Sequence, residues 1–118
     1  MVPCGAGIPF RNSDGSEANQ GMLTVLLQCT HTLHPILVVC LHLKAKSGAQ
    51  CEAIRHEQAC QALHLADGLV ERASADSSSP CSMLICGDFN DTPTSKCLQV
   101  LRRSDFVLKI KLSSFGML

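Results

Sequence analysis

The amino-acid sequence predicts a layered domain of the α/β or α+β class, and three observations lead to this expectation. Hydrophobic residues make up 46% of the 118 residues, which is enough to bury a core. Apolar runs of strand length alternate with a longer stretch of helical periodicity, and no internal repeat occurs. The predicted order is strand, strand, helix, strand, loop and short helix, which is typical of a sheet covered by helices.

The first half of the chain predicts a β-hairpin. Residues 1–20 are rich in Gly, Pro, Ser and Asn without any period, so an irregular segment is expected there. Residues 21–29 predict a strand, and residues 30–35 a turn. Residues 36–43 form a nearly continuous β-branched and apolar run, which is typical of a central strand covered on both faces. The two strands are expected to pair with each other.

A long helix is predicted after the hairpin. Ser47 is a suitable N-cap, and the helix is expected to continue to about Arg72. Apolar side chains recur at spacings of three and four residues, as on the buried face of a helix. The expected buried stripe consists of Ile54, Gln58, Ala62, Leu65 and Leu69.

The remaining elements are shorter. Residues 75–80 form a Ser-rich polar linker, and residues 82–86 predict a short buried strand. Residues 92–95, Thr-Pro-Thr-Ser, are expected to cap a short helix that ends near Arg103.

Charge and aromatic content limit the classes of partner. Ten Lys and Arg against ten Asp and Glu give a formal charge of zero, which argues against a broadly basic nucleic-acid-binding surface. With no Trp or Tyr and only four Phe, few aromatic side chains are available to stack on bases. The N-terminus has no signal-peptide pattern, and the longest apolar stretch, residues 33–43, is too short to span a bilayer. We expect a soluble monomer without a membrane segment, located in the cytoplasm, with the mitochondrion as an alternative.

Eight cysteines raise the question of a metal site or a disulfide framework. The sequence contains no Cys-x-x-Cys motif and no Cys/His pair at zinc-site spacing; Cys81 and Cys86 are the closest pair along the chain. Cys40 and Cys86 lie inside apolar runs, where a thiol behaves as a small hydrophobic group. We therefore expect reduced and mostly structural cysteines in an intracellular protein.

Asp88 and Asn90 are the strongest candidates for chemistry, because they come directly after a predicted buried strand. The end of a strand is rigid, and its side chains can be directed into a cleft. Phosphoester hydrolysis needs a group that orients or deprotonates water and donors for the phosphate oxygens. An acidic residue followed two positions later by an amide can supply both. The simpler alternative is an Asp/Asn turn that caps the strand.

Three further motifs accompany this one. Residues 84–95 (LICGDFNDTPTS) resemble a Gly-Asp-Phe-Asn motif with its Pro-containing turn, and residues 42–46 (HLKAK) resemble a His-Leu-Lys-Ala-basic motif. Arg55-x-x-Gln58 follows on the predicted helix, and residues 19–20 (Asn-Gln) precede the hairpin. Together, in this order, they resemble the nocturnin-like branch of the endonuclease/exonuclease/phosphatase superfamily, which is related to poly(A) nucleases.

The resemblance implies a fold and an activity. The fold would be α+β, as part of a four-layer α/β/β/α sandwich, with residues 19–108 in the partial domain, 1–18 an irregular segment and 109–118 an unmatched tail. The activity would be Mg²⁺-dependent phosphoester hydrolysis, with NADP(H) as substrate of a 2′-phosphatase or poly(A) RNA as substrate of a 3′-exoribonuclease. The neutral charge and the scarcity of aromatic residues favour the small phosphorylated nucleotide.

The resemblance also implies roles for individual residues. Asp88 corresponds to the general base or water-orienting carboxylate, and Asn90 to the donor for a phosphate oxygen. His42 corresponds to a strand-end histidine that faces the scissile phosphate; the alternative is a core histidine. Lys44 and Lys46 correspond to a basic pair that binds a substrate phosphate; the alternative is two solvated loop lysines.

Arg55 and Gln58 are expected to support the site rather than to take part in chemistry. If Gln58 is buried, it must form hydrogen bonds, and we expect them to reach backbone near the site loops.

Two parts of the family pattern are missing from this sequence. The metal-binding Glu would lie in a Gln-Glu motif on an earlier strand, and a closing Asp-His pair would supply a second histidine; neither dipeptide occurs here. We therefore expect a truncated gene product or one part of a larger enzyme, weak or inactive alone; the expected metal-binding Glu is absent, and the metal ligands are not identified. A non-catalytic fragment or interaction module is the alternative.

Overall fold

The computed structural model describes residues 6–75, 79–102 and 107–108. Expectations for residues 1–5, 76–78 and 109–118, and for the end of the last helix at residue 103, lie outside the described residues. The elements are β1 (Ala6–Arg11), β2 (Glu17–Gln28), β3 (Pro35–His42), α1 (Ala49–Ala75), β4 (Ser82–Asp88), α2 (Lys96–Arg102) and β5 (Val107–Leu108).

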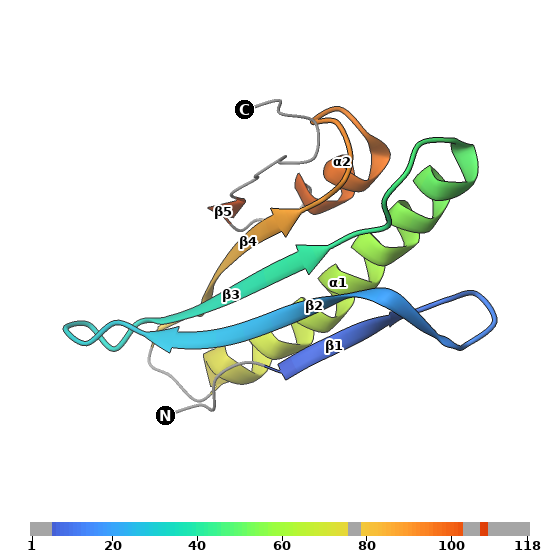
Figure 1. Ribbon diagram of the computed structural model, residues 1–118. Coiled ribbons are helices and arrows are strands. Elements are labelled where there is room, and N and C mark those ends of the chain that lie inside the picture. Colours follow the sequence, from blue (N-terminus) through green and yellow to red (C-terminus); the bar gives the residue numbers. More distant parts are fainter. Residues whose placement is uncertain (1–5, 76–78, 103–106, 109–118) are drawn as a thin grey trace.

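The described strands form a single sheet in the order β1-β2-β3-β4-β5 (Figure 1). The pairs β1–β2 and β2–β3 are antiparallel, whereas β3–β4 and β4–β5 are parallel. The predicted hairpin is thus confirmed as β2 and β3. The parallel arrangement of β3 and β4 follows from the long helical crossover between them.

The expected irregular N-terminus is wrong for the residues that the structure describes. β1 lies within it, and β2 begins at Glu17, four residues earlier than predicted. β1 pairs with β2 through a turn in which Gly15 adopts a φ of 88° and Asp14 accepts a hydrogen bond of 2.9 Å from the Ser16 backbone N–H. The Asp-Gly dipeptide is a strong hairpin signal, because glycine tolerates positive φ. Pairing with β2 satisfies the backbone of a segment whose composition alone favours a loop.

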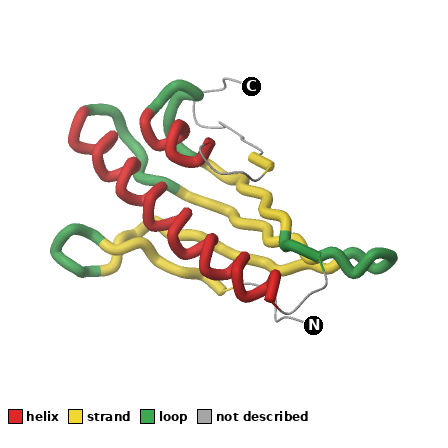
Figure 2. Tube along the Cα trace, turned by 180° about the vertical axis from the view of Figure 1, so that it is seen from behind, coloured by secondary structure: helices red, strands yellow, loops and turns green. Residues whose placement is uncertain are grey.

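Helices α1 and α2 contribute to one core on one face of the sheet. Viewed from the side opposite to Figure 1, α1 crosses in front of the strands (Figure 2). Leu98 and Leu101 of α2 and Val39 and Ile85 of the central strands are all at most 2% exposed in this core. None of the described residues covers the opposite face, where Leu23 of β2 remains 46% exposed.

The expectation that the central strand is covered on both faces therefore holds for one face only. Within the described residues the chain forms two layers, one of strands and one of helices. This arrangement is a mixed α+β fold that is compatible with part of a four-layer sandwich.

The buried face of α1 is rotated from the predicted stripe. Its buried residues are Arg55, Gln58, Ala59, Ala62, Ala66 and Val70. Of the expected positions, Gln58 and Ala62 are buried, whereas Ile54, Leu65 and Leu69 are only half-buried. The small alanines allow the helix backbone to approach the sheet closely, so that the larger apolar residues lie at the margins of the contact.

The ends of the helices show how local sequence sets their limits. The backbone N–H of Glu52 bonds to the carbonyl of Gly48 (3.0 Å), so Gly48 rather than Ser47 is the N-cap of α1. Ser95 caps α2 as expected, because its Oγ accepts the Leu98 N–H at 3.4 Å. Neither helix, within the described residues, has the length and apolarity needed to cross a membrane.

Candidate active site

The carboxyl ends of β3 and β4 bring His42 and Asp88 together. The two residues are register partners in the parallel pair, and the Leu43 N–H extends the pairing by bonding to the Asp88 carbonyl at 3.1 Å. The expectation that the two strands are neighbours is confirmed. Side chains alternate along a strand, so both residues belong to the face that the helices leave uncovered. His42 is exposed and Asp88 is half-buried.

Gly87 lets β4 approach β3 closely just before Asp88. It has a φ of 131°, and a Cβ atom at this position would overlap the backbone nitrogen and carbonyl oxygen of Leu41. Phe89, on the other side of Asp88, is fully buried in the core. A backbone that only glycine allows and a buried aromatic ring together fix the position of the carboxylate between them.

Asn90 ties the ends of the two strands to each other. Its side-chain amide donates to the carbonyl of Leu43 (2.9 Å), and its backbone N–H donates to Oδ1 of Asp88 (3.0 Å). The residue has a φ of 49° and is buried, which suits asparagine because it tolerates the left-handed region. Asn90 therefore has a structural role, and a role as donor to a phosphate remains a prediction.

A buried ion pair that the sequence analysis missed lies beneath this loop. Nε of Arg55 donates to Oδ2 of Asp91 at 2.7 Å, and the two side chains are only 3% and 11% exposed. The Asp91 carboxylate also accepts the Thr92 backbone N–H (2.8 Å) and contacts Sγ of Cys97 (3.6 Å). Burial raises the pKa of the Cys97 thiol to about 11. The sequence analysis gave no signal for Asp91, because Arg55 lies outside the predicted buried stripe of α1 and its need for an anion follows only from its burial.

Arg55 and Gln58 hold the loop that follows β3. One Arg55 guanidinium nitrogen (Nη1) donates to the carbonyls of Lys44 (3.0 Å) and Lys46 (2.7 Å). Gln58 accepts the backbone N–H of Lys44 at 2.8 Å, which is the contact to site backbone that we expected. Gln58 also donates to Oε1 of Gln20 on β2 (3.2 Å). Residues from all four sequence motifs therefore meet at one end of the sheet.

The two lysines differ in their surroundings. Lys44 is half-buried, whereas Lys46 is exposed and has a φ of 79°. Neither forms an ion pair with any residue that the structure describes. With its backbone held by Arg55, the loop can present two positive charges beside the strand ends.

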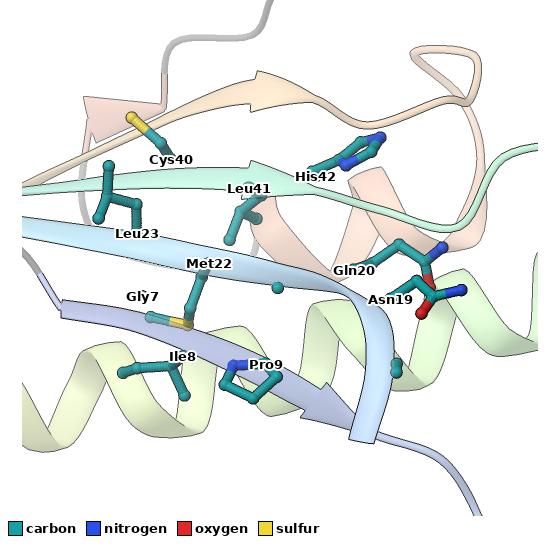
Figure 3. A pocket seen from close by; sticks show the side chains of 12 residues that line it. Gly7, Ile8, Pro9, Asn19, Gln20, Met22, Leu23, Cys40, Leu41 and His42 are labelled. Atoms are coloured by element: carbon teal, nitrogen blue, oxygen red, sulfur yellow. The ribbon is translucent and has the colours of Figure 1, made fainter. Parts of the chain in front are cut away.

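An open groove of about 410 Å³ adjoins His42 on the uncovered face of the sheet (Figure 3). Its lining includes Asn19 and Gln20 of β2 and Cys40 of β3. Figure 3 shows His42 and Cys40 on the same side of β3, opposite to Leu41. A ligand in this groove would therefore reach the His42 imidazole.

The described residues do not make a magnesium site by themselves. No three His, Cys, Asp or Glu side chains among them are arranged to hold a metal ion. Asp91 is engaged by Arg55, which leaves Asp88 and Asn90 as the oxygen-bearing side chains of the motif. Protein Mg²⁺ sites commonly use one or two carboxylates together with water and substrate phosphates, and Asp88 is one such carboxylate.

Comparisons with known proteins show the fold. No family model matches the sequence, and no curated protein matches it. A solved structure, the human Nocturnin catalytic domain with bound sulfate anion, superposes with a TM-score of 0.71 at 23% sequence identity. The match covers 89% of this chain and 35% of that chain, so this chain spans about a third of the length of the similar structure. The chain thus has the fold of part of a nocturnin-type catalytic domain.

Proposed function

We propose that this chain forms one side of the active site of a phosphoester hydrolase. The observation that carries the proposal is the pairing of His42 with Asp88 at neighbouring strand ends, with the Lys44–Lys46 loop held beside them. In sheets with parallel strands, ligands bind at the carboxyl ends of those strands. The His42 imidazole and two lysine ammonium groups at such an edge suit an anionic substrate, and the Asp88 carboxylate suits the activation of water.

Each group has a role that its position supports. Asp88 would orient or deprotonate the attacking water, because its carboxylate is held by the Asn90 N–H at a rigid strand end. His42, exposed one strand away, would face the scissile phosphate and hydrogen-bond to its oxygens. Lys44 and Lys46 would bind a further phosphate of the substrate through charge.

The proposed substrate is a phosphorylated nucleotide, with NADP(H) as the first candidate and poly(A) RNA as the second. The similar human Nocturnin structure has a bound sulfate, a tetrahedral dianion like a phosphate monoester. The formal charge of zero favours a short substrate over a long polyanion, because a long RNA is bound through many cationic contacts.

Magnesium would be the cofactor of a complete domain of this type. No three candidate ligands cluster among the described residues, and we propose that a further carboxylate from outside them completes the site. The chain alone should then show little or no turnover, because a divalent metal supplies several kcal/mol of transition-state stabilisation in such reactions.

The alternative is a non-catalytic fragment or interaction module. It is favoured by the uncovered face of the sheet, where Leu23 and Leu27 are 46% and 49% exposed. An exposed apolar surface is typical of an interaction site.

A chimera separates the two functions. Residues 19–102 would replace the matching segment of the human Nocturnin catalytic domain, and phosphate release from NADP(H) would be measured with and without Mg²⁺. Asp88→Asn should lower turnover by a factor on the order of 10²–10⁴. Asp67→Asn, an exposed carboxylate on α1, is the matched control and should not change it.

The lysines test the substrate assignment in the same chimera. Lys44→Ala and Lys46→Ala should raise KM for NADP(H) more than for a singly phosphorylated nucleotide, with kcat little changed. If a folded chimera with Asp88→Asn retains full activity, Asp88 has no catalytic role. The Asp88–Asn90 segment would then be only a turn that caps the strand. A folded chimera without any activity would favour the non-catalytic reading.

A further inference from the structure

Two thiols face each other on the uncovered side of the sheet. Cys40 of β3 and Cys86 of β4 are register partners, and their Sγ atoms are 3.3 Å apart. Both side chains are half-buried. Cys40 and Cys86 lie two residues before His42 and Asp88, respectively, on the same two strands and on the same face of the sheet.

We propose that Cys40 and Cys86 form a reversible dithiol–disulfide site, and that its co-reactant is a low-molecular-weight disulfide such as oxidised glutathione. Directly paired residues on adjacent strands lie within the Cα separations that a disulfide bridges, and the two sulfur atoms are already in contact. No described element covers this face, and Cys40 lines the open groove there (Figure 3), so a small co-reactant can reach it.

The reaction balances as two thiol–disulfide exchanges. Cys40 gives up its proton, and its thiolate attacks one sulfur of the glutathione disulfide. The S–S bond of the co-reactant breaks, and one glutathione leaves as thiol after taking a proton. Cys86 then gives up its proton and attacks Sγ of Cys40, which expels the second glutathione as thiol. Two electrons pass from the protein dithiol to the co-reactant, and the protein loses two hydrogen atoms.

The order of the two steps follows from the different surroundings of the two thiols. Burial and the neighbouring thiol of Cys40 raise the pKa of Cys86 to about 11, so little thiolate is present there at neutral pH. The thiolate is the nucleophile in these exchanges. Cys40 lines the open groove, whereas Cys86 does not, so Cys40 is assigned the first attack on a co-reactant that arrives there. Cys86 follows as the resolving thiol, because the mixed disulfide places its target sulfur next to it.

The other cysteines of the described residues have no such partner. Cys81 is buried and its thiol donates to the Ser82 carbonyl (3.3 Å), whereas Cys97 contacts Asp91. Cys60 is exposed on α1 and is expected to form mixed disulfides only. A specific cross-link between β3 and β4 is thus the signature of the proposed site.

Mass spectrometry of the purified full-length chain tests the proposal. The chain would be treated with oxidised glutathione, the remaining thiols blocked, and the protein digested with trypsin. Cys40 falls in peptide 12–44 and Cys86 in peptide 73–96. Because these peptides also contain Cys29 and Cys81, the experiment uses the Cys29→Ser/Cys81→Ser double variant, in which each peptide keeps one cysteine. The expected result is a linked 12–44/73–96 pair that a reducing agent separates.

Single variants then assign the steps. Cys86→Ser should lose the cross-link and accumulate glutathione on Cys40, whereas Cys60→Ser should retain the cross-link. The proposal is overturned if the double variant carries glutathione on both peptides without linking them. It is equally overturned if peptide 12–44 is linked only when Cys29 is present, because Cys29 is the thiol whose pKa is lowered by a hydrogen bond with Thr32. The readout does not depend on catalytic activity, so its outcome is separate from that of the proposed function.

Discussion

Replacing Asp91 with alanine should lower the free energy of unfolding of this chain by about 3–5 kcal/mol. The change leaves the Arg55 guanidinium, 3% exposed, without the carboxylate that lies 2.7 Å from its Nε. The guanidinium keeps its hydrogen bonds to the Lys44 and Lys46 carbonyls, but a buried charge that has lost its counter-ion is still strongly destabilising. The Thr92 N–H loses its acceptor as well. Since domains are typically stable by about 5–15 kcal/mol, this loss is a large fraction of the free energy of unfolding and should be measured easily.

The chain contains a matched control for this substitution. Arg11 and Glu17 form the exposed counterpart, with an N–O distance of 3.7 Å and side chains that are 60% and 62% exposed. Glu17→Ala should therefore change stability very little, because solvent screens the pair. The double variant Arg55→Met/Asp91→Leu should recover much of the loss, since it removes both buried charges.

Urea unfolding followed by far-UV circular dichroism measures all of these variants. Asp91→Asn, which keeps the shape of the side chain, is the milder substitution if the alanine variant does not fold. If Asp91→Ala and Glu17→Ala shift the urea midpoint by similar amounts, the ion pair does not hold the loop. A double variant no more stable than Asp91→Ala would likewise contradict the reasoning, because the unpaired guanidinium would not be the cause of the loss.

Three other substitutions or conditions test particular contacts by the same unfolding assay. Gly87→Ala should destabilise the chain by about 1–3 kcal/mol, because a Cβ overlaps the Leu41 backbone, and Gly7→Ala, which meets nothing within 4 Å, is its control; equal shifts would contradict this. Gly68→Ala should stabilise α1 by about 0.5–1 kcal/mol, since nothing obstructs a Cβ there. A loss of stability would contradict the expectation that the added methyl group fits. The urea midpoint should fall as pH rises from 9.0 towards about 11, because the thiols of Cys97 and Cys86 ionise near 9.0 when unfolded, whereas burial raises both pKa values to about 11 in the folded chain. The Cys97→Ala variant should show a smaller fall in the urea midpoint over this pH range. If its pH profile is the same as that of the unsubstituted chain, the Cys97 thiol does not contribute.

Much of the sheet could be predicted because its strands carry local signals. The apolar run of β3 and the short run of β4 each end at polar motif residues, and this pattern placed the site at the strand ends. β1 was missed because Gly, Pro and Ser dominate its surroundings, and only pairing with β2 makes it a strand. The Asp14-Gly15 turn was the available signal.

The packing of α1 could not be read from hydrophobicity alone. The predicted stripe correctly includes Gln58 and Ala62. It also selects Ile54 and Leu65, which are only half-buried, and it misses Arg55 and several small apolar residues on the buried face. The burial of Arg55 depends on an anion 36 residues further along the chain. A sequence pattern within one element does not contain that information, so Asp91 was predicted neither as buried nor as part of the site.

The contacts at the site separate residues that folding requires from residues that it does not. Gly87, Asn90 and Arg55 resemble family motifs, yet close packing, a strand tie and a buried ion pair account for each of them. A non-catalytic fragment with this fold would need the same residues, so their presence does not favour catalysis. His42 and Lys46 are different, because both are exposed and no contact among the described residues requires an imidazole or an ammonium group at these positions. The hypothesis of catalysis therefore depends on His42, Lys46 and the Asp88 carboxylate, and substitutions at these three residues are the ones that test it.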